Sequence, residues 1–157
     1  MANKRKRQHI LARALILREY EGAHEVLLAQ NVGKSHAFLP GGHVDPGEGL
    51  MHAVVRELDE EIGVSARVVA YLGAVEHQFL TEKGKSRYEV NHVFLTVLDE
   101  PLHEPRSREA HLRFYWCPLT ALEEHNLQPE PLRALIARHV AGDAAIWWGS
   151  TLPEYAQ

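Results

Sequence analysis

Three glutamates in the first half of the chain have the residue type and spacing to hold a metal ion. Glu57, Glu60 and Glu61 follow Arg56 in a segment of helix-forming residues. At about 100° per helical residue, Glu60 and Glu61 lie roughly 60° and 40° to either side of Glu57, so the three carboxylates share one arc. Like charges at these spacings repel each other, and a hard divalent cation converts that repulsion into ligation. Oxygen ligands without cysteine favour Mg²⁺ or Mn²⁺ over zinc.

An acidic metal site of this kind suits a substrate that carries a diphosphate. Mg²⁺ commonly binds through a few carboxylates together with substrate phosphates. The ions neutralise the phosphates and lower the pKa of a bound water. The alternative interpretation is a solvated acidic helix face without catalytic function, because runs of charge are usually exposed.

The helix that must position these acids is predicted over residues 48–62. Asp45 or Gly47 is expected to cap its start, and Gly63 is expected to end it in the left-handed conformation. Apolar residues at four-residue spacing predict one face that packs against a core. That face consists of Leu50, Val54, Leu58 and Ile62.

The segment 42–64 as a whole resembles the signature of the Nudix hydrolases, in which glycines, glutamates and one arginine stand at fixed spacing. Every specified position is filled, by Gly42, Glu48, Arg56, Glu57, Leu58, Glu60, Glu61, Gly63 and Val64. Pro40, Gly41 and Gly42 also match the usual lead-in. The resemblance implies an α/β fold, an α/β/α sandwich with a central mixed sheet. It also implies hydrolysis, with Mg²⁺ or Mn²⁺, of a nucleoside diphosphate linked to another group.

The same resemblance implies roles for individual residues of this Nudix box (residues 42–64). Glu57, Glu60 and Glu61 are expected to be metal ligands, together with the backbone carbonyl of Gly41 just before the box. Glu57 is also the preferred general base, although Glu60 or Glu61 remains open for that role.

Two further box residues are expected to support the ligands. Arg56 is expected to orient a glutamate through a charge-assisted contact. Glu48 is expected to belong to the same hydrogen-bonded network.

Residues outside the box are expected to complete the site. In Nudix enzymes a carboxylate outside the box often serves as an additional ligand or base, and Glu89 and Glu109 are the two candidates. Glu89 interrupts an apolar strand, which is costly on a buried face unless the acid has a role. A nucleotide also calls for a stacking aromatic, although each candidate fits the core equally well. The candidates are Phe38, Phe79, Tyr88, Phe94 and Tyr115.

Composition is that of a soluble globular protein, with 157 residues, 45% apolar and 24% charged. We expect one Nudix hydrolase domain over residues 9–157, behind a flexible basic N-terminus at residues 1–8. The net charge of −4 argues against a nucleic-acid partner, and no apolar run is long enough for a membrane span. The single cysteine, Cys117, is expected to be a buried thiol, and it fits a cytoplasmic location.

Alternating and helical apolar patterns predict the remaining elements. Strands are expected at residues 9–17, 25–30, 38–42, 66–80, 87–98 and 111–117, with helices at 118–124 and from 129 or 130 to 140. These patterns alone leave α/β and α+β open. Trp147 and Trp148 are expected to fold back on the domain, to join two copies of the chain, or to cover the substrate cleft.

The expected substrate is a nucleoside triphosphate, an oxidised nucleotide or a sugar nucleotide. Diadenosine polyphosphate hydrolases often carry a tyrosine where Thr81 stands here. Two alternative functions remain open. One is a catalytically silent module that senses a nucleotide, and the other is an RNA 5′-end pyrophosphohydrolase that uses the basic residues at positions 4–7. The resemblance also leaves a homodimer open, because family members are often dimers.

Overall fold

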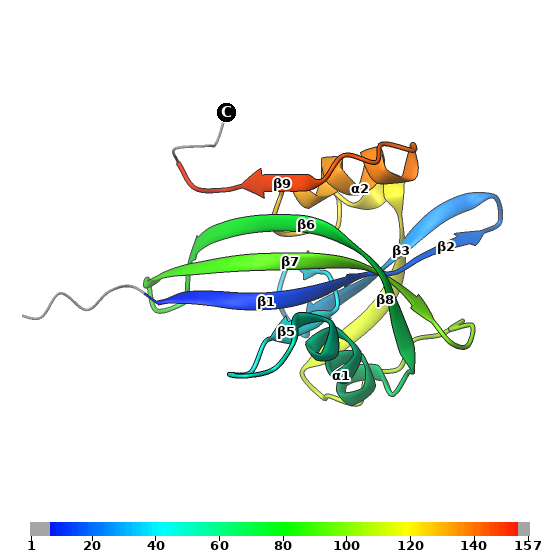
Figure 1. The fold of residues 1–157 in the computed structure, drawn as a ribbon, viewed down its shortest axis with the longest axis horizontal. Helices are drawn as coiled ribbons and strands as arrows, with labels where there is room; N and C mark the ends of the chain where they lie inside the picture. The colour runs from blue at the N-terminus through cyan, green and yellow to red at the C-terminus, as the bar shows by residue number, and fades with distance from the viewer. Residues whose placement is uncertain (1–6, 154–157) are drawn as a thin grey trace, which may run out of the picture.

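Two β-sheets lie between two helices, as Figure 1 shows. The computed structural model describes residues 7–153. The helices are α1 (Leu50–Ile62) and α2 (Leu132–Val140), and a short 3₁₀ helix, η1, spans Leu119–Ala121. The strands are β1 (Gln8–Leu15), β2 (Leu17–Tyr20), β3 (Ala23–Asn31), β4 (Ala37–Phe38), β5 (Gly41–His43), β6 (Ala66–Leu80), β7 (Ser86–Leu98), β8 (Leu112–Pro118) and β9 (Trp147–Ser150).

The first sheet is mixed and has the strand order β5-β1-β7-β6-β9. In the second sheet β3 pairs antiparallel with β2, β4 and β8. The single strand expected at residues 9–17 is therefore two strands, because β1 pairs with β5 and β7 whereas β2 pairs with β3. Between them, the carbonyl of Ile16 accepts a hydrogen bond of 3.0 Å from the amide of Leu27. One continuous segment thus links the two sheets.

Side chains of the inner strands point alternately to the two faces, and both faces are buried, one against α1 and the other against α2. The result is three layers: helix, sheets, helix. In β1, Ala12 and Ala14 pack in the cluster that faces α1, whereas Leu15 packs in the cluster that contains the buried residues of α2. From α1, the residues Ala53, Val54, Leu58 and Ile62 are buried in the first of these clusters. The predicted apolar face of this helix and the α/β architecture are therefore confirmed.

The N-terminal boundary of α1 differs from the prediction. The helix begins at Leu50, and Gly49 in extended conformation is the N-cap in place of Asp45 or Gly47. Gly47 has a φ of +80°, which keeps the chain in a turn and places Glu48 just before the helix. The predicted left-handed end is correct, since Gly63 has a φ of +72° and its amide bonds the carbonyls of Leu58 and Asp59.

The helix expected at residues 118–124 is shorter than predicted and is only the 3₁₀ turn η1. The last helix begins at Leu132, two or three residues later than expected. The long strand at 66–80 has the predicted bounds. The strand at 86–98 begins one residue earlier than predicted, and the strand at 112–118 is shifted by one residue at both ends.

Strand β9 is an element that the sequence patterns missed. It pairs in parallel with β6, where Gly73 lies opposite Trp147. Trp147 is buried in the core next to α2, so this residue folds back on the domain, whereas Trp148 is exposed. A side chain at Gly73 would collide with the backbone of Trp147, so only glycine lets the two strands approach so closely.

Cys117 is buried, as predicted, and burial raises the pKa of its thiol to about 11. Among residues 7–153 there is no helix with the length and hydropathy needed to cross a membrane. Lys4, Arg5 and Lys6 of the basic arm lie outside the described residues.

Candidate active site

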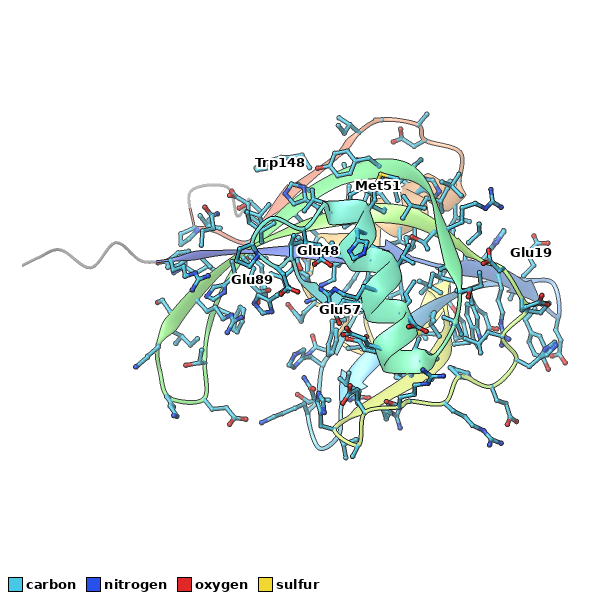
Figure 2. All side chains as sticks on the ribbon, turned by 60° about the horizontal axis from the view of Figure 1, so that its bottom comes forward. Glu19, Glu48, Met51, Glu57, Glu89 and Trp148 are labelled. Carbon is cyan, nitrogen blue, oxygen red and sulfur yellow. The ribbon has the colours of Figure 1, made fainter. Side chains whose placement is uncertain are left out.

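Helix α1 presents the box acids to the first sheet, beside β5. Glu61 is buried, Glu57 is largely buried and the side chain of Glu60 is half-exposed. A Cβ at Gly42 would lie 2.8 Å from Glu57 Oε1, so the carboxylate of Glu57 rests directly on the backbone of β5. Figure 2 shows Glu57 and Glu48 at the helix and Glu89 on the neighbouring sheet. The shared arc predicted for the three acids is consistent with these positions.

Arg56 connects three of the box glutamates. Its Nε and Nη2 donate to the two carboxylate oxygens of Glu48 at 2.6 and 2.8 Å, which is a bidentate pair. Its Nη1 donates to Glu57 Oε1 at 3.2 Å and to Glu60 Oε2 at 3.1 Å. Nη2 also donates to the carbonyl of His43 in β5 at 3.2 Å. One guanidinium thus fixes the helix acids relative to the adjacent strand.

Glu48, in the turn before α1, ties this network to its neighbours through hydrogen bonds. Its Oε1 accepts the amide of Asp45 at 3.1 Å, and its Oε2 lies 2.7 Å from His52 Nδ1. The hydrogen bonds from Arg56, above all, hold the pKa of Glu48 at about 2. Contact with Glu48 in turn raises the pKa of Arg56. Both groups therefore stay charged at neutral pH, which fits a positioning role.

Glu61 is the acid whose environment most clearly fits a cation. Its Oε2 is buried without a hydrogen-bond partner. Burial, followed by the hydrogen bond and charge of Glu57, raises the pKa of Glu61 to about 8. In residues 7–153 no three His, Cys, Asp or Glu side chains are already close enough together to hold an ion. In the site itself, Glu60 is turned toward Arg56. A hard cation between Glu57 and Glu61 would satisfy the unpaired oxygen and relieve their repulsion.

Gly41, the expected carbonyl ligand, is part of β5 at the same site. It pairs with Arg13 of β1 and has a φ of +134°. A Cβ at this position would collide with the carbonyl of Ala12. Only glycine therefore brings the β5 backbone this close to β1.

A cleft of about 910 Å³ opens on the sheet face that carries Glu89. Its walls come from the β6–β7 hairpin, from the loop between β3 and β4, and from residues 126–129. The aromatic and imidazole side chains lining it are His36, Phe38, His77 and Phe79, and the cationic ones are Arg13, Lys34, Lys83, Lys85 and Arg87. The cleft therefore combines flat apolar surfaces with positive charge.

Arg13 links this cleft to the acids of α1. Its Nε donates to Asn91 Oδ1 at 3.1 Å, and its Nη1 donates to the carbonyl of Leu39 at 3.2 Å. Burial lowers the pKa of Arg13, while the charges of Glu89, Glu61 and Glu57 act to raise it. The charges of all three acids therefore act on this one guanidinium.

Glu89 lies at the cleft, on the buried face of β7. Its Oε1 is 3.2 Å from Nε of Arg87. Nη2 of Arg87 donates to His43 Nε2 at 2.7 Å, and burial followed by the charge of Arg87 lowers the pKa of His43. Only 9% of Glu89 is exposed, so this acid does lie on a buried strand face, where an unpaired charge is costly.

Glu109, the other candidate from outside the box, is exposed in the loop that precedes β8. Its charge contributes to the raised pKa of Glu61. The amide of Arg108 donates to the carbonyl of Glu61 at 2.7 Å, which holds this loop against the end of α1. Glu109 is therefore near the acids but is not one of the cleft residues.

The stacking candidates separate into two groups. Phe38 and Phe79 line the cleft, whereas Phe94 is buried in the core and Tyr88 and Tyr115 are not among the lining residues. Arg13 and His77 are among the cleft residues that pattern analysis of the sequence missed. The interruption of an apolar strand by Arg13 was a usable signal, because charge inside a strand core is costly. For His77 the sequence carries no such signal.

Comparison with known proteins identifies the family. The chain belongs to the Nudix family of hydrolases, since the family model described as "NUDIX domain" matches residues 8–138. The asymmetrical bis(5′-nucleosyl)-tetraphosphatase of Caenorhabditis elegans is 34% identical over 107 residues, which cover 67% of this chain and 75% of that protein.

Solved structures agree with this assignment. The chain matches the MutT protein of Methanosarcina mazei with a TM-score of 0.64 and 25% identity, covering 87% of this chain and 96% of that one. It matches the ORF135 protein of E. coli with a TM-score of 0.60 and 25% identity, covering 89% and 96%. The chain spans only 33% and 18% of two curated relatives from Mycobacterium tuberculosis and C. elegans, which are 30% and 45% identical over the matched parts.

Replacing Arg56 with lysine should reduce kcat/KM about tenfold. Lysine keeps the charge but loses the bidentate pair with Glu48 and the simultaneous contacts with Glu57 and Glu60. Loss of a group that orients metal ligands typically costs about 10- to 100-fold in metal affinity or activity. Steady-state kinetics over a range of Mg²⁺ concentrations measures the effect. Unchanged kinetics at every Mg²⁺ concentration would show that the arginine does not orient the acids.

Proposed function

We propose that the protein hydrolyses the pyrophosphate bond of a nucleoside diphosphate linked to another group, using Mg²⁺ or Mn²⁺. The observation that carries this proposal is the position of the cleft. Its cationic and aromatic lining includes Arg13 and Glu89, and the charges of Glu57 and Glu61 in α1 act on the same Arg13 guanidinium. A nucleotide bound there has its phosphates beside the acids.

The lining favours a substrate with an extended phosphate chain. Phe38 and Phe79 offer flat surfaces for a nucleobase. Lys34, Lys83 and Lys85 surround the mouth with positive charge, which attracts phosphates more than a neutral sugar. Nucleoside triphosphates, ordinary or oxidised, are therefore the proposed class ahead of sugar nucleotides. The tetraphosphatase relative, by its name, also acts on a nucleotide with several phosphates.

The chain's own residues have distinct tasks in this reaction. Glu57, Glu60, Glu61 and the carbonyl of Gly41 would hold the ions, and Glu57 accepts the proton of the attacking water. Bound Mg²⁺ or Mn²⁺ supplies charge neutralisation at the anhydride and a more acidic water. Arg56 and Glu48 keep the helix acids in place. Glu89, on the cleft side, is the proposed additional ligand or base.

Incubating the protein with a nucleotide panel and identifying products by mass is the direct test. The four ribonucleoside triphosphates, 8-oxo-dGTP, diadenosine tetraphosphate, UDP-glucose and a short 5′-triphosphorylated RNA form a sufficient panel. We expect turnover with Mg²⁺ or Mn²⁺ and none after addition of EDTA. Binding without turnover under any divalent metal would instead identify a silent sensor. Turnover confined to RNA 5′ ends would identify the RNA-processing alternative.

A further inference from the structure

The segment that follows the family match reaches the wall of the substrate cleft. The match ends at residue 138, whereas β9 spans Trp147–Ser150 and continues into Thr151. The amide of Thr151 donates to the carbonyl of Glu76 in β6 at 3.1 Å. Thr151 therefore lies directly beside the strand that forms one wall of the cleft.

His77 is the cleft residue next to Thr151. It stands opposite Glu89 in the β6–β7 register, on the face that lines the cleft. Its ring stacks on that of Phe79, with centroids 5.0 Å apart and an interplanar angle of 27°. The imidazole of His77 thus forms a flat polar surface with Phe79 on one side and Glu89 on the neighbouring strand.

The hydroxyl of Thr151 fixes the orientation of this imidazole. Its Oγ lies 2.9 Å from His77 Nδ1 and also accepts the backbone amide of Gln78 at 2.9 Å. Nδ1 is thereby occupied, while Nε2 has no hydrogen-bond partner among the residues that the structure describes. Nε2 lies on the opposite side of the ring from Nδ1, so it is the polar atom that His77 can offer to a ligand.

Strand β9 is packed firmly against β6, which keeps the Thr151 hydroxyl in a defined position beside His77. Trp147 is 4% exposed in the core, and Gly73 admits its backbone without space for a side chain. Ser150 Oγ donates to Glu76 Oε1 at 2.9 Å. The end of β9 is therefore held against β6 by three groups, which are the buried indole of Trp147, the hydroxyl of Ser150 and the amide of Thr151.

We propose that His77 is a substrate-contacting residue that hydrogen-bonds the nucleoside through Nε2, and that Thr151 is the positioning residue that holds its ring for this contact. This inference rests on the proposed function, because it assigns the nucleoside to the same cleft. It makes the C-terminal strand part of the substrate site although the strand lies beyond the matched family residues.

The test compares Thr151→Val, Thr151→Ser and Ser150→Ala in steady-state kinetics with the four ribonucleoside triphosphates. Valine keeps the shape of threonine but removes the hydroxyl, and should raise KM about fivefold for the preferred nucleotide, with kcat unchanged within about twofold. Serine restores the hydroxyl and should restore KM. Ser150→Ala is the matched control, because it removes a hydrogen bond between the same strands without touching His77.

A double-mutant cycle separates the positioning role from general weakening of β9. His77→Phe keeps the stacking on Phe79 but removes both ring nitrogens, and should raise KM at least as much as Thr151→Val. In the His77→Phe background, Thr151→Val should have no further effect. An unchanged KM in Thr151→Val, or an equal rise in Ser150→Ala, would overturn the proposal.

Equilibrium binding distinguishes failure of this inference from failure of the proposed function. Dissociation constants for the same four nucleotides are measured by calorimetry in EDTA, where no turnover occurs. If the wild-type protein binds but never hydrolyses, the proposed function fails, while weaker binding by Thr151→Val than by Ser150→Ala still supports the role of His77. If none of the four nucleotides binds, the inference is wrong.

Discussion

Glu57→Gln should lower kcat by at least about a hundredfold while the protein remains folded. Glutamine has the same shape, so it still fits over Gly42, but it can neither accept a proton nor ligate a hard cation as strongly. A positioned general base alone contributes about 10²- to 10⁴-fold, and loss of a ligand adds to that. Single-turnover kinetics at saturating Mg²⁺ measures the chemical step directly.

Asp59→Asn is the matched control for this variant. Asp59 is an exposed acid on the same helix, so its replacement removes one negative charge without removing a group that faces β5. We expect nearly wild-type kcat for Asp59→Asn and similar melting temperatures for both proteins. Equal losses in the two variants would mean that total charge, and not the position of Glu57, controls the reaction. Full activity in both Glu57→Gln and Glu61→Gln would contradict the assigned site.

The second large effect concerns Glu61 and depends on pH. Its pKa is about 8 in the folded protein and near 4.5 when it is exposed. Between these values the unfolded chain has lost this proton while the folded chain keeps it, so stability falls as pH rises from 4.5 to 8. Without divalent metal, we expect this loss to reach at most about 5 kcal/mol across that pH range, and it should appear as a falling melting temperature.

Metal binding should show the opposite pH dependence. A cation must displace the proton of Glu61, so its affinity should rise about tenfold per pH unit well below pH 8, and about fiftyfold in total from pH 6 to pH 8. Thermal melts in EDTA and Mn²⁺ titrations at three pH values measure both effects. Glu61→Gln is the control, because it should flatten the difference in each series. Metal affinity in the wild type that does not change over this range would exclude Glu61 as a ligand.

The local features of the site could be predicted from the sequence because they depend on spacing within one helix. The arc of Glu57, Glu60 and Glu61, the apolar face beside it and the left-handed Gly63 all follow from helical geometry. The start of α1 was misplaced by two residues because Glu48 is a good helix former by itself, whereas Gly47 and Gly49 on either side keep it in a turn.

Features that depend on pairing between distant segments could not be predicted in this way. Arg13 and Glu89 approach each other only because β1 and β7 pair in parallel, and no local pattern specifies that register. The same holds for β9, whose four residues carry no alternating pattern and whose place is determined by packing on Gly73. The acidic helix α1 could therefore be predicted from the sequence, whereas the cleft beside Glu89 depends on the folded arrangement of distant strands.

Two of the loops that line the cleft are joined by an ion pair between Lys34 in the β3–β4 loop and Glu82 in the β6–β7 turn. Both side chains are substantially exposed, so the pair contributes no more than about 1 kcal/mol and weakens with added salt. An incoming anion can therefore replace Glu82 as the partner of Lys34 at little energetic cost. Ionic strength should consequently alter how readily ligands enter, through the attachment between these two loops as well as through general screening.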